Sequence, residues 1–121
     1  MDQGVSALIE DLDQQGMLND VLVVVTGEFG RTPKINSKGG RDHWGSLCTL
    51  ALSGGGLKMG QVIGQSSPRI EVPATTPVTP QDLMATILHI YGLDQQLQYV
   101  NNQGRPTFLI EDGQPILELV S

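Results

Sequence analysis

The hydrophobic residues at the start of the chain recur with the period of a helix. Within residues 1–16, apolar side chains lie three or four positions apart, at Val5, Leu8, Ile9 and Leu12. Acidic and amide residues fill most of the other positions, and Gly16 is of a residue type that commonly ends helices. This pattern predicts an amphipathic helix with one apolar face, ending near Gly16.

A continuous apolar run follows the predicted helix. Residues 21–25 have the sequence VLVVV, with no polar residue in alternation. Such a run is typical of a strand covered on both faces, as in the parallel sheets of α/β proteins. Residues 47–56, LCTLALSGGG, predict a second short strand that ends in three glycines. A helix that leads directly into a buried strand favours an α/β fold, with a mostly parallel sheet and flanking helices.

Residues 79–92 carry the clearest helix boundaries in the chain. Thr79 suits the N-cap position, Pro80 the first helical position and Asp82 the first turn. A wide apolar face follows, made of Leu83, Met84, Ile87, Leu88, Ile90 and Tyr91. Gly92 ends the predicted helix.

The end of the chain predicts a terminal hairpin. Residues 106–119, PTFLIEDGQPILEL, have a turn signal at Asp112-Gly113 between two apolar stretches. The chain supplies two helices and two or three core strands, fewer alternating units than a free-standing α/β domain needs. Residues 1–121 are therefore predicted to form a single partial domain, a piece of a larger one. Because an incomplete sheet leaves an edge or an apolar face uncovered, we also expect the chain to self-associate.

Composition narrows the classes of partner. The 121 residues are 39% hydrophobic and 17% charged, as in a globular protein. The net charge of -6 lacks the basic footprint that non-specific nucleic-acid binding needs, so no nucleic-acid partner is expected. No apolar run approaches the roughly 20 residues of a membrane span. Cys48 is the single cysteine, and its apolar surroundings in the sequence predict a buried, unreactive thiol.

Candidate chemistry is concentrated in the glycine-rich loop of residues 27–46. Glu28 follows the apolar strand directly, and ligands of open α/β sheets collect outside the carboxyl ends of strands. A carboxylate placed there can bind a divalent cation. The alternative, which the sequence leaves open, is a salt bridge from Glu28 to Arg31 or Lys34.

Three further residues of the loop have candidate roles. His43 offers an imidazole, a good ligand for zinc, and Asp42 beside it could be a second ligand. The alternative is that His43 is an ordinary hydrogen-bonded or surface residue. Arg31 has the planar fork that suits phosphate or sulfate, and is a candidate anion clamp. No activated nucleophile is recognisable, because Thr26 and Ser46 lack a neighbouring base and no G-x-S-x-G motif occurs.

The order of these motifs resembles a known superfamily. The segments GEFGRTP and GRDHW, followed by LALSGGGLKMG and the helical QDLMATILHIYGL, are similar to the C-terminal part of alkaline phosphatase/sulfatase superfamily proteins. The closest resemblance is to a sulfatase-like domain-of-unknown-function family numbered fifteen-oh-one. The likeness covers about residues 21–93.

The resemblance implies the C-terminal part of an alkaline-phosphatase-like fold and roles for named residues. Glu28 stands where the superfamily has a metal-binding Asp, and His43 matches its late metal-ligating histidine. Asp42 is then a ligand or a residue that orients His43. The implied cofactor is a divalent metal, zinc or calcium, and the implied substrate of the longer parent protein is a small sulfate or phosphate ester.

The resemblance also implies what this chain does not supply. The superfamily's nucleophile belongs to a region that has no match here, so the chain by itself is expected to be inactive although its parent is a hydrolase. Phe29 stands where a second ligand, His or Asn, is usual. The alternative is therefore a non-catalytic, degenerate module with a surface or carbohydrate-associated binding role. Longer members of the family look exported, which implies an exported parent and leaves the location of this chain open.

Overall fold

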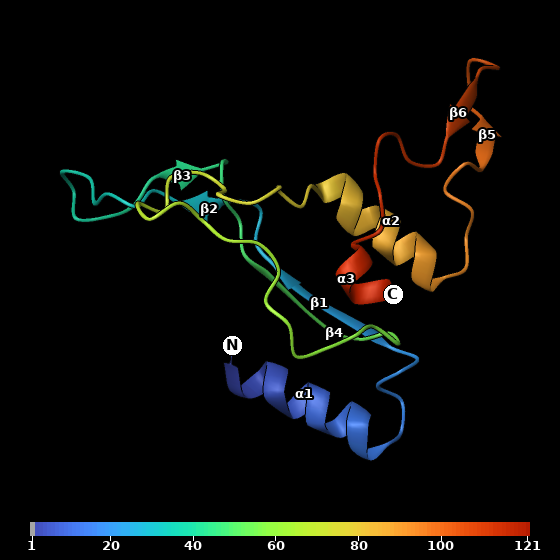
Figure 1. Cartoon of the computed structure of the whole chain (residues 1–121), viewed down its shortest axis with the longest axis horizontal. Coiled ribbons are helices and arrows are strands. Elements are labelled where there is room, and N and C mark those ends of the chain that lie inside the picture. The colour runs from blue at the N-terminus through green and yellow to red at the C-terminus, as the bar shows by residue number, and fades with distance from the viewer. Residues whose placement is uncertain (1) are drawn as a thin grey trace. The chain divides into compact units, whose positions relative to one another are not determined.

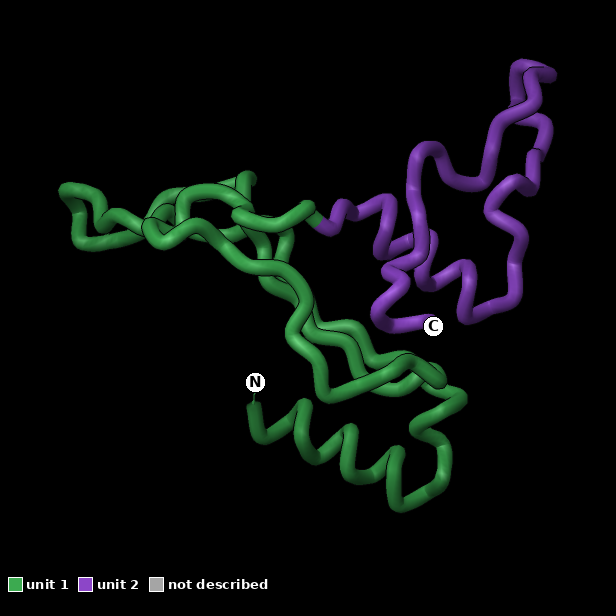
Figure 2. Tube along the Cα trace, viewed as in Figure 1, with its two compact units in different colours: residues 1–77 green, residues 78–121 purple. Residues whose placement is uncertain are grey.

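A computed structural model describes residues 2–121 (Figure 1). The elements are α1 (Asp2–Gln14), β1 (Leu22–Thr26), β2 (Gly30–Arg31), β3 (His43–Trp44), β4 (Leu50–Gly54), α2 (Pro80–Ile90), β5 (Gln98–Val100), β6 (Pro106–Phe108) and α3 (Leu117–Val120). They are divided between two compact units, unit 1 at residues 1–77 and unit 2 at residues 78–121 (Figure 2).

Unit 1 begins with the predicted amphipathic helix. In α1, Leu12 from the apolar face is buried, whereas the acidic residues on the other face are exposed. Gly16 has a positive φ of 69°, and the N–H of Met17 donates to the carbonyl of Leu12 at 2.8 Å. A glycine in the left-handed conformation lets the chain close the last turn and leave the helix, so the predicted stop at Gly16 is confirmed.

The two predicted strands of unit 1 exist, but the parallel sheet is wrong. β1 and β4 pair antiparallel, with Val24 opposite Leu52 and Thr26 opposite Leu50. Across residues 2–121 the strands form three antiparallel ladders of two strands each and no parallel pair, in a mixed α/β chain. A parallel neighbour needs a crossover connection that is usually a helix. The 23 residues between β1 and β4 contain none, because they fold back on themselves.

The segment from Leu22 to Gly54 is one long two-stranded arm (Figure 1). The β1–β4 ladder forms the base of the arm. After a short irregular stretch, the chain leaving β1 continues as β2, the chain entering β4 comes from β3, and β2 pairs antiparallel with β3. The pairing continues from Thr32 N–H to the carbonyl of Asp42 at 3.0 Å, and from Asn36 N–H to that of Gly40 at 2.8 Å. The apolar run of β1 is therefore not enclosed in a sheet, and Val24 is 36% exposed.

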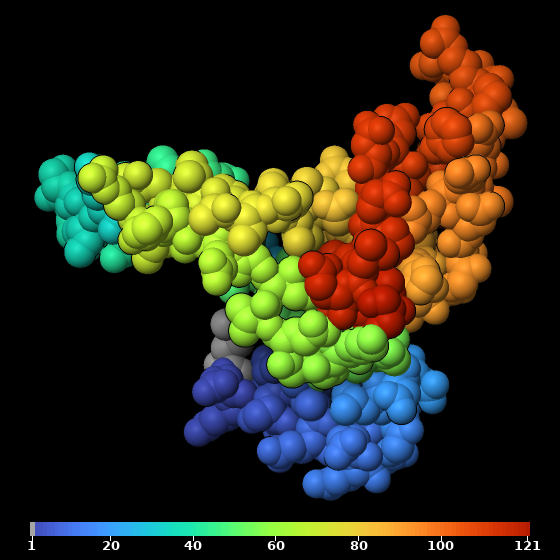
Figure 3. Space-filling model, in the orientation of Figure 1, coloured from blue at the N-terminus to red at the C-terminus, as the bar shows by residue number. Residues whose placement is uncertain are grey.

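Two further segments complete unit 1. After β4, the backbone turns through Gly54, Gly55 and Gly56, all with positive φ, into an irregular stretch in which Leu57 is buried. Both this stretch and α1 are visible at the surface of unit 1 (Figure 3). Residues 65–75 then form a narrow turn closed by a bridge between Ser66 and Pro73.

Unit 2 is organised around α2, and its predicted boundaries are confirmed. Thr79 is the N-cap and forms a capping box with Asp82, with Pro80 at the first helical position. Ala85, Thr86 and Leu88 on one face are buried, and Gly92 follows the helix with φ 67°. These local signals predicted the helix correctly because capping and φ restrictions act within a few residues.

The predicted hairpin at Asp112-Gly113 is wrong. The hairpin of unit 2 is β5–β6, which turns through residues 101–105, where Asn101 accepts backbone N–H groups of Gln103 and Arg105. At Asp112-Gly113 the chain instead passes the first turn of α2: a side chain at Gly113 would clash with the carbonyl of Gln81. Residues after this point pack as a short segment and α3, because Ile116 and Leu119 are buried.

Candidate anion and metal site on the β2–β3 arm

The β2–β3 ladder brings together residues that are twelve positions apart in the chain. Arg31 lies directly opposite His43. Two residues before Arg31, the ring of Phe29 lies against the imidazole of His43, with centroids 4.1 Å apart and planes inclined by 39°. The guanidinium carbon of Arg31 lies 5.9 Å from the centroid of the same Phe29 ring. A cation at this distance is attracted by the electrons of the ring.

Phe29 therefore orients both candidate site residues. A ring contact of this type is worth about 0.5–1.5 kcal/mol beyond the area it buries, and a cation–ring contact at an exposed site about 0.5–1 kcal/mol. Arg31 is exposed and also donates a long hydrogen bond, 3.4 Å, to the carbonyl of Arg41. The guanidinium is thus positioned, and it faces solvent with most of its donors unused by these contacts.

The tip of the arm is stabilised by Asn36. Its side-chain oxygen accepts the backbone N–H groups of Lys38 and Gly40, both at 3.0 Å, and its amide donates to the carboxylate of Asp42 at 2.9 Å. The N–H of Asp42 in turn donates to the hydroxyl of Thr32 at 3.1 Å. Asp42 is therefore tied into the turn, next to His43 in sequence, and is better placed to hold the loop than to bind a ligand with both oxygens.

The two arginines of the arm have different environments. The guanidinium of Arg41 donates from Nη1 to the carbonyls of Thr32 and Pro33, both at 2.6 Å. Arg41 thus links the two sides of the arm at its surface. Arg31 makes no such pair of short contacts. Both arginines are exposed, and Arg31 keeps more of its donors free for an anion.

Trp44 joins the arm to the narrow turn of residues 65–75. Its indole Nε1–H donates to the carbonyl of Glu71 at 2.7 Å. That carbonyl is presented by a tight turn in which Ile70 has a positive φ of 56° and donates its N–H to the carbonyl of Ser67 at 2.8 Å. A partly buried indole N–H thus has a hydrogen-bond partner, which holds Trp44 against the turn.

Gly30 is required where the arm narrows. A β-carbon at this position would clash with the carbonyl oxygen of Leu47 and would come within 3.3 Å of that of Trp44. Only a glycine lets the two backbones approach this closely, so β2 begins here and Phe29 and Arg31 are placed on either side of the contact.

The structure does not gather the three predicted metal ligands into one cluster. Glu28 is exposed in the bend between β1 and β2, whereas His43 packs on Phe29 and Asp42 bonds to Asn36. Within residues 2–121, no three His, Cys, Asp or Glu side chains are grouped as a metal site. These donors by themselves do not complete a site for zinc or calcium, and a metal here would need ligands from outside this set.

Three residues with positioning roles were not found from the sequence. The sequence predicts Phe29 only as a replacement for a ligand and predicts no role for Asn36 or Arg41. An Asn two and four residues before turn N–H groups is a weak local signal for a side chain that closes a turn. The contacts of Phe29 and Arg41 depend on the antiparallel register of the arm, which the sequence pattern did not provide.

A family model described as Protein of unknown function (DUF1501) matches residues 1–120. The chain belongs to this family. DUF1501 is a sulfatase-like family of the alkaline phosphatase superfamily, so the resemblance drawn from GEFGRTP and GRDHW is confirmed. No curated protein and no solved structure matches the chain.

Cys48 and the helices add no second candidate centre among the described residues of this DUF1501 chain. The thiol of Cys48 is exposed, contrary to the buried thiol expected from the sequence, because the stretch before β4 lies on the surface of the arm. Its sulfur lies 3.5 Å from the carbonyl oxygen of Gly27. No helix of residues 2–121 is long and apolar enough to cross a membrane.

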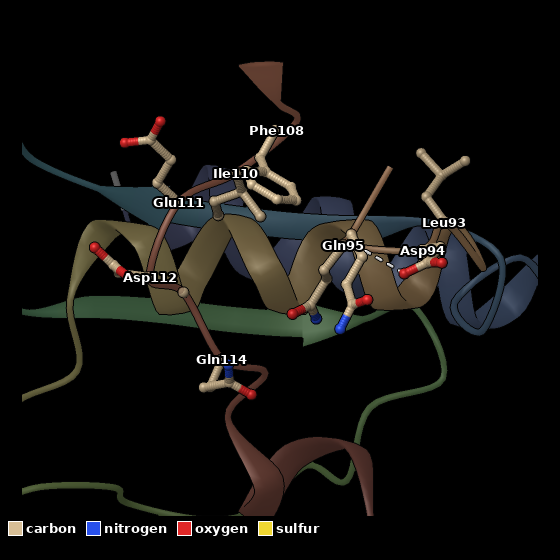
Figure 4. Close-up of a pocket in the computed structure, with 10 residues that line it drawn as sticks. Leu93, Asp94, Gln95, Phe108, Ile110, Glu111, Asp112 and Gln114 are labelled. Carbon is tan, nitrogen blue, oxygen red and sulfur yellow. Dashed lines mark hydrogen bonds between the residues drawn. The ribbon is translucent and has the colours of Figure 1, made fainter. Parts of the chain in front are cut away.

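Unit 2 of the DUF1501 chain contains an open depression (Figure 4). Its carboxylates point in different directions: Glu111 and Asp112 lie at one side of the view and Asp94 at the other. Asp94 accepts the backbone N–H of Gln96 at 2.8 Å. The remaining lining residues are apolar or carry amides, namely Leu93, Gln95, Phe108, Ile110, Gly113 and Gln114. The depression therefore has no converging set of charged groups.

Proposed function

We propose that this chain is the part of a sulfatase- or phosphatase-like, metal-dependent ester hydrolase that contributes metal ligands and an anion-binding arginine, but not the nucleophile. The observation that supports the proposal most is the pairing of Arg31 with His43 in the β2–β3 ladder. The two residues that family resemblance and side-chain chemistry single out lie side by side, with Phe29 in contact with both.

In this proposal each residue of the arm has a defined task. Arg31 holds the oxyanion of a sulfate or phosphate ester, for which its planar fork is suited. His43, oriented by Phe29, and Glu28 would hold a divalent metal, and Asn36 fixes the carboxylate of Asp42, the neighbour of His43 in sequence. When bound, the metal would supply positive charge against the negative charge that develops on the ester oxygens.

The proposal requires further donors and a nucleophile from a longer parent protein. Residues 2–121 hold no group of three candidate ligands, and no activated Ser or Thr was recognised in the sequence. The chain is therefore proposed to be inactive alone, as one partial domain of that parent.

A second function has a specific observation in its favour. The His43 imidazole is packed against Phe29, the residue that replaces a usual ligand, so the site could have lost its metal and kept a ring surface with an adjacent cation. Such a surface suits a non-catalytic module that binds a carbohydrate or another surface, since fold alone does not fix function.

Anion binding by the chain is the first test of the proposal. Adding inorganic sulfate or phosphate at constant ionic strength is expected to shift the NMR signals of the Arg31 side chain and of the 27–46 loop, and Arg31→Gln is expected to abolish the shifts. Arg69→Gln is the matched control, because Arg69 is exposed in the turn of residues 65–75. Equal responses of both variants, or no response of the unmodified chain, would contradict the anion role.

Metal binding separates the two functions. Equilibrium dialysis of the longer parent with zinc or calcium is expected to show a bound ion that is lost in Glu28→Gln and in His43→Ala. His89→Ala is the matched control, since His89 is exposed on α2 in unit 2. Absence of bound metal from the unmodified parent would contradict the hydrolase proposal and favour the proposal of a non-catalytic binding module.

A further inference from the structure

The arm tip, residues 32–42, concentrates positive charge in an acidic chain. Four of the chain's seven lysines and arginines lie within residues 31–41, a stretch that contains no acidic residue, whereas the rest of the chain has three basic and thirteen acidic residues. Lys34 and Lys38 are exposed, and among the described residues neither side chain pairs with a carboxylate. The arm tip is therefore a cationic surface that the chain does not neutralise.

An apolar side chain is exposed among these cations. Ile35 follows Lys34 at the turn of the arm and is 65% exposed. A single exposed apolar residue is ordinary on a protein surface. This one lies on the same turn as two unpaired lysines, and the turn projects from the rest of unit 1 (Figure 2). Basic and apolar side chains together are suited to the boundary between anionic lipid headgroups and acyl chains.

The arm itself fixes the shape of its tip. The hydroxyl of Thr32 donates to the carbonyl of Lys34 at 2.9 Å, and the side-chain oxygen of Asn36 accepts the N–H of Lys38 at 3.0 Å. The guanidinium of Arg41 donates to two carbonyls across the tip. These contacts are all made within residues 32–42. A surface that is ordered before binding loses less conformational entropy when it docks.

The charges of the arm tip argue against its burial inside a longer protein. Moving an unpaired ammonium group out of water is strongly unfavourable unless an anion accompanies it. An anionic lipid surface supplies such anions and leaves the lysines partly hydrated. The acidic remainder of the chain does not prevent this approach. Residues 30–36 span about 20 Å when extended, about twice the screening length of roughly 8–10 Å at physiological salt.

We propose that the arm tip docks on a membrane surface that contains anionic lipids, with Ile35 entering the headgroup region and Lys34 and Lys38 lying against the charged headgroups. A soluble polyanion would be attracted to the same lysines, but it has no apolar layer for Ile35 to enter. The exposed isoleucine therefore favours a lipid surface. The docking does not use Arg31 or His43 and does not depend on the proposed hydrolase function.

Co-sedimentation of the chain with lipid vesicles tests the proposal. The chain is expected to bind vesicles of phosphatidylserine and phosphatidylcholine, but not vesicles of phosphatidylcholine alone. Lys34→Gln/Lys38→Gln should weaken binding about 30-fold, because each charge near an anionic surface contributes about fivefold. Lys58→Gln/Arg69→Gln has the same net charge, alters two exposed residues outside the arm tip, and should bind like the unmodified chain. No binding to the anionic vesicles, or equal binding of the two double variants, overturns the proposal.

Ile35 distinguishes a lipid surface from a soluble polyanion. Ile35→Ser should weaken vesicle binding about tenfold, as expected for one partly inserted aliphatic side chain. Val62→Ser is the matched control, since Val62 is 95% exposed outside the arm, and it should bind normally. Vesicle binding that is unchanged in Ile35→Ser, together with binding of a soluble sulfated polysaccharide, would assign the arm tip to a soluble polyanion and overturn the proposal.

The longer parent protein provides a second test, because docking requires the arm tip to be exposed there as well. The parent is expected to bind the anionic vesicles and to respond to the same substitutions in the same order. A parent that does not bind the anionic vesicles overturns the proposal. Ester hydrolysis is not part of either measurement, so the outcome is independent of whether the parent is a hydrolase.

Discussion

Thr86 is the most completely buried polar side chain described in this protein, at 1% exposure. Its hydroxyl donates to the carbonyl of Asp82 one turn earlier, at 2.7 Å, and accepts the N–H of Ile116 at 3.0 Å. One hydroxyl thus links α2 to the C-terminal segment of unit 2 and satisfies a backbone donor that would otherwise lack a partner there.

Replacing Thr86 by valine should lower the free energy of unfolding of unit 2 by about 1–3 kcal/mol, since valine keeps the shape and leaves the Ile116 N–H unsatisfied. Hydrogen exchange of the α2 amides is the measurement, and faster exchange is expected. Thr86→Ser retains the hydroxyl and should restore most of the protection. Equal exchange in the valine variant and the unmodified protein would show that the link carries no stability.

Asp82 makes the stability of unit 2 dependent on pH. The hydroxyl of Thr79, then the N–H of Gln114 and the N–H of Thr79, lower the pKa of Asp82 below its ordinary value of 3.8. A folded-state pKa below the unfolded value contributes stability that is fully present above the unfolded pKa. This contribution is lost as pH falls through 3.8 towards the lower folded-state value.

Asp82→Asn should therefore destabilise unit 2 by about 1 kcal/mol near neutral pH, the typical value of a lost cap or hydrogen bond. The difference from the unmodified protein should shrink when both are measured at about pH 3. Hydrogen exchange of the α2 amides at the two pH values checks this. Glu111→Gln, an exposed change in the same unit, is the control. A difference that does not change with pH would refute the assignment.

At the scale of elements, the 22–54 arm shows how an accurate local pattern can give a wrong topology. The run at residues 21–25 and the stretch LCTLALSGGG both predicted strands, and both strands are present. Their pairing direction depends on what the intervening chain does. That chain closes on itself through Asn36 and Gly40, a contact with little signature in hydrophobic periodicity.

Helix boundaries were predicted correctly because the signals that set them are local. The capping box of Thr79 and Asp82, and the left-handed glycines Gly16 and Gly92, act within a single turn of chain. The bend at Asp112-Gly113 was recognised as a turn signal, but its outcome depends on the approach of Gly113 to Gln81, about thirty residues earlier. Long-range contacts of this kind are invisible to local pattern.

Gly30→Ala is expected to destabilise the arm by about 1–3 kcal/mol, the usual cost of forcing extra volume into a close contact, because its β-carbon would clash with the carbonyl of Leu47. Trp44, the single tryptophan, lies on the paired strand and reports unfolding of unit 1 by fluorescence in urea. Gly45→Ala is the control, with nothing within 4 Å of its added carbon. Equal urea midpoints for the two variants would contradict the close approach.

At the scale of the whole molecule, the sequence was sufficient to predict the family but not to establish the site. The motifs GEFGRTP and GRDHW were sufficient for the DUF1501 family, which matches residues 1–120. The roles of Glu28, Asp42, His43 and Arg31 stay predictions. Residues 2–121 show how His43 and Arg31 are held, but a metal site also needs donors that this set does not supply.

Hydrolysis by the longer parent protein tests the central claim most directly. With zinc or calcium present, the parent is expected to cleave an aryl sulfate or an aryl phosphate, and His43→Ala should reduce kcat/KM by a factor of about 10–100, as expected for loss of a metal ligand or its support. His89→Ala should leave turnover unchanged. Turnover that survives His43→Ala at its full rate, or a parent that cleaves neither ester, would contradict the assignment of the β2–β3 arm to a hydrolase active site.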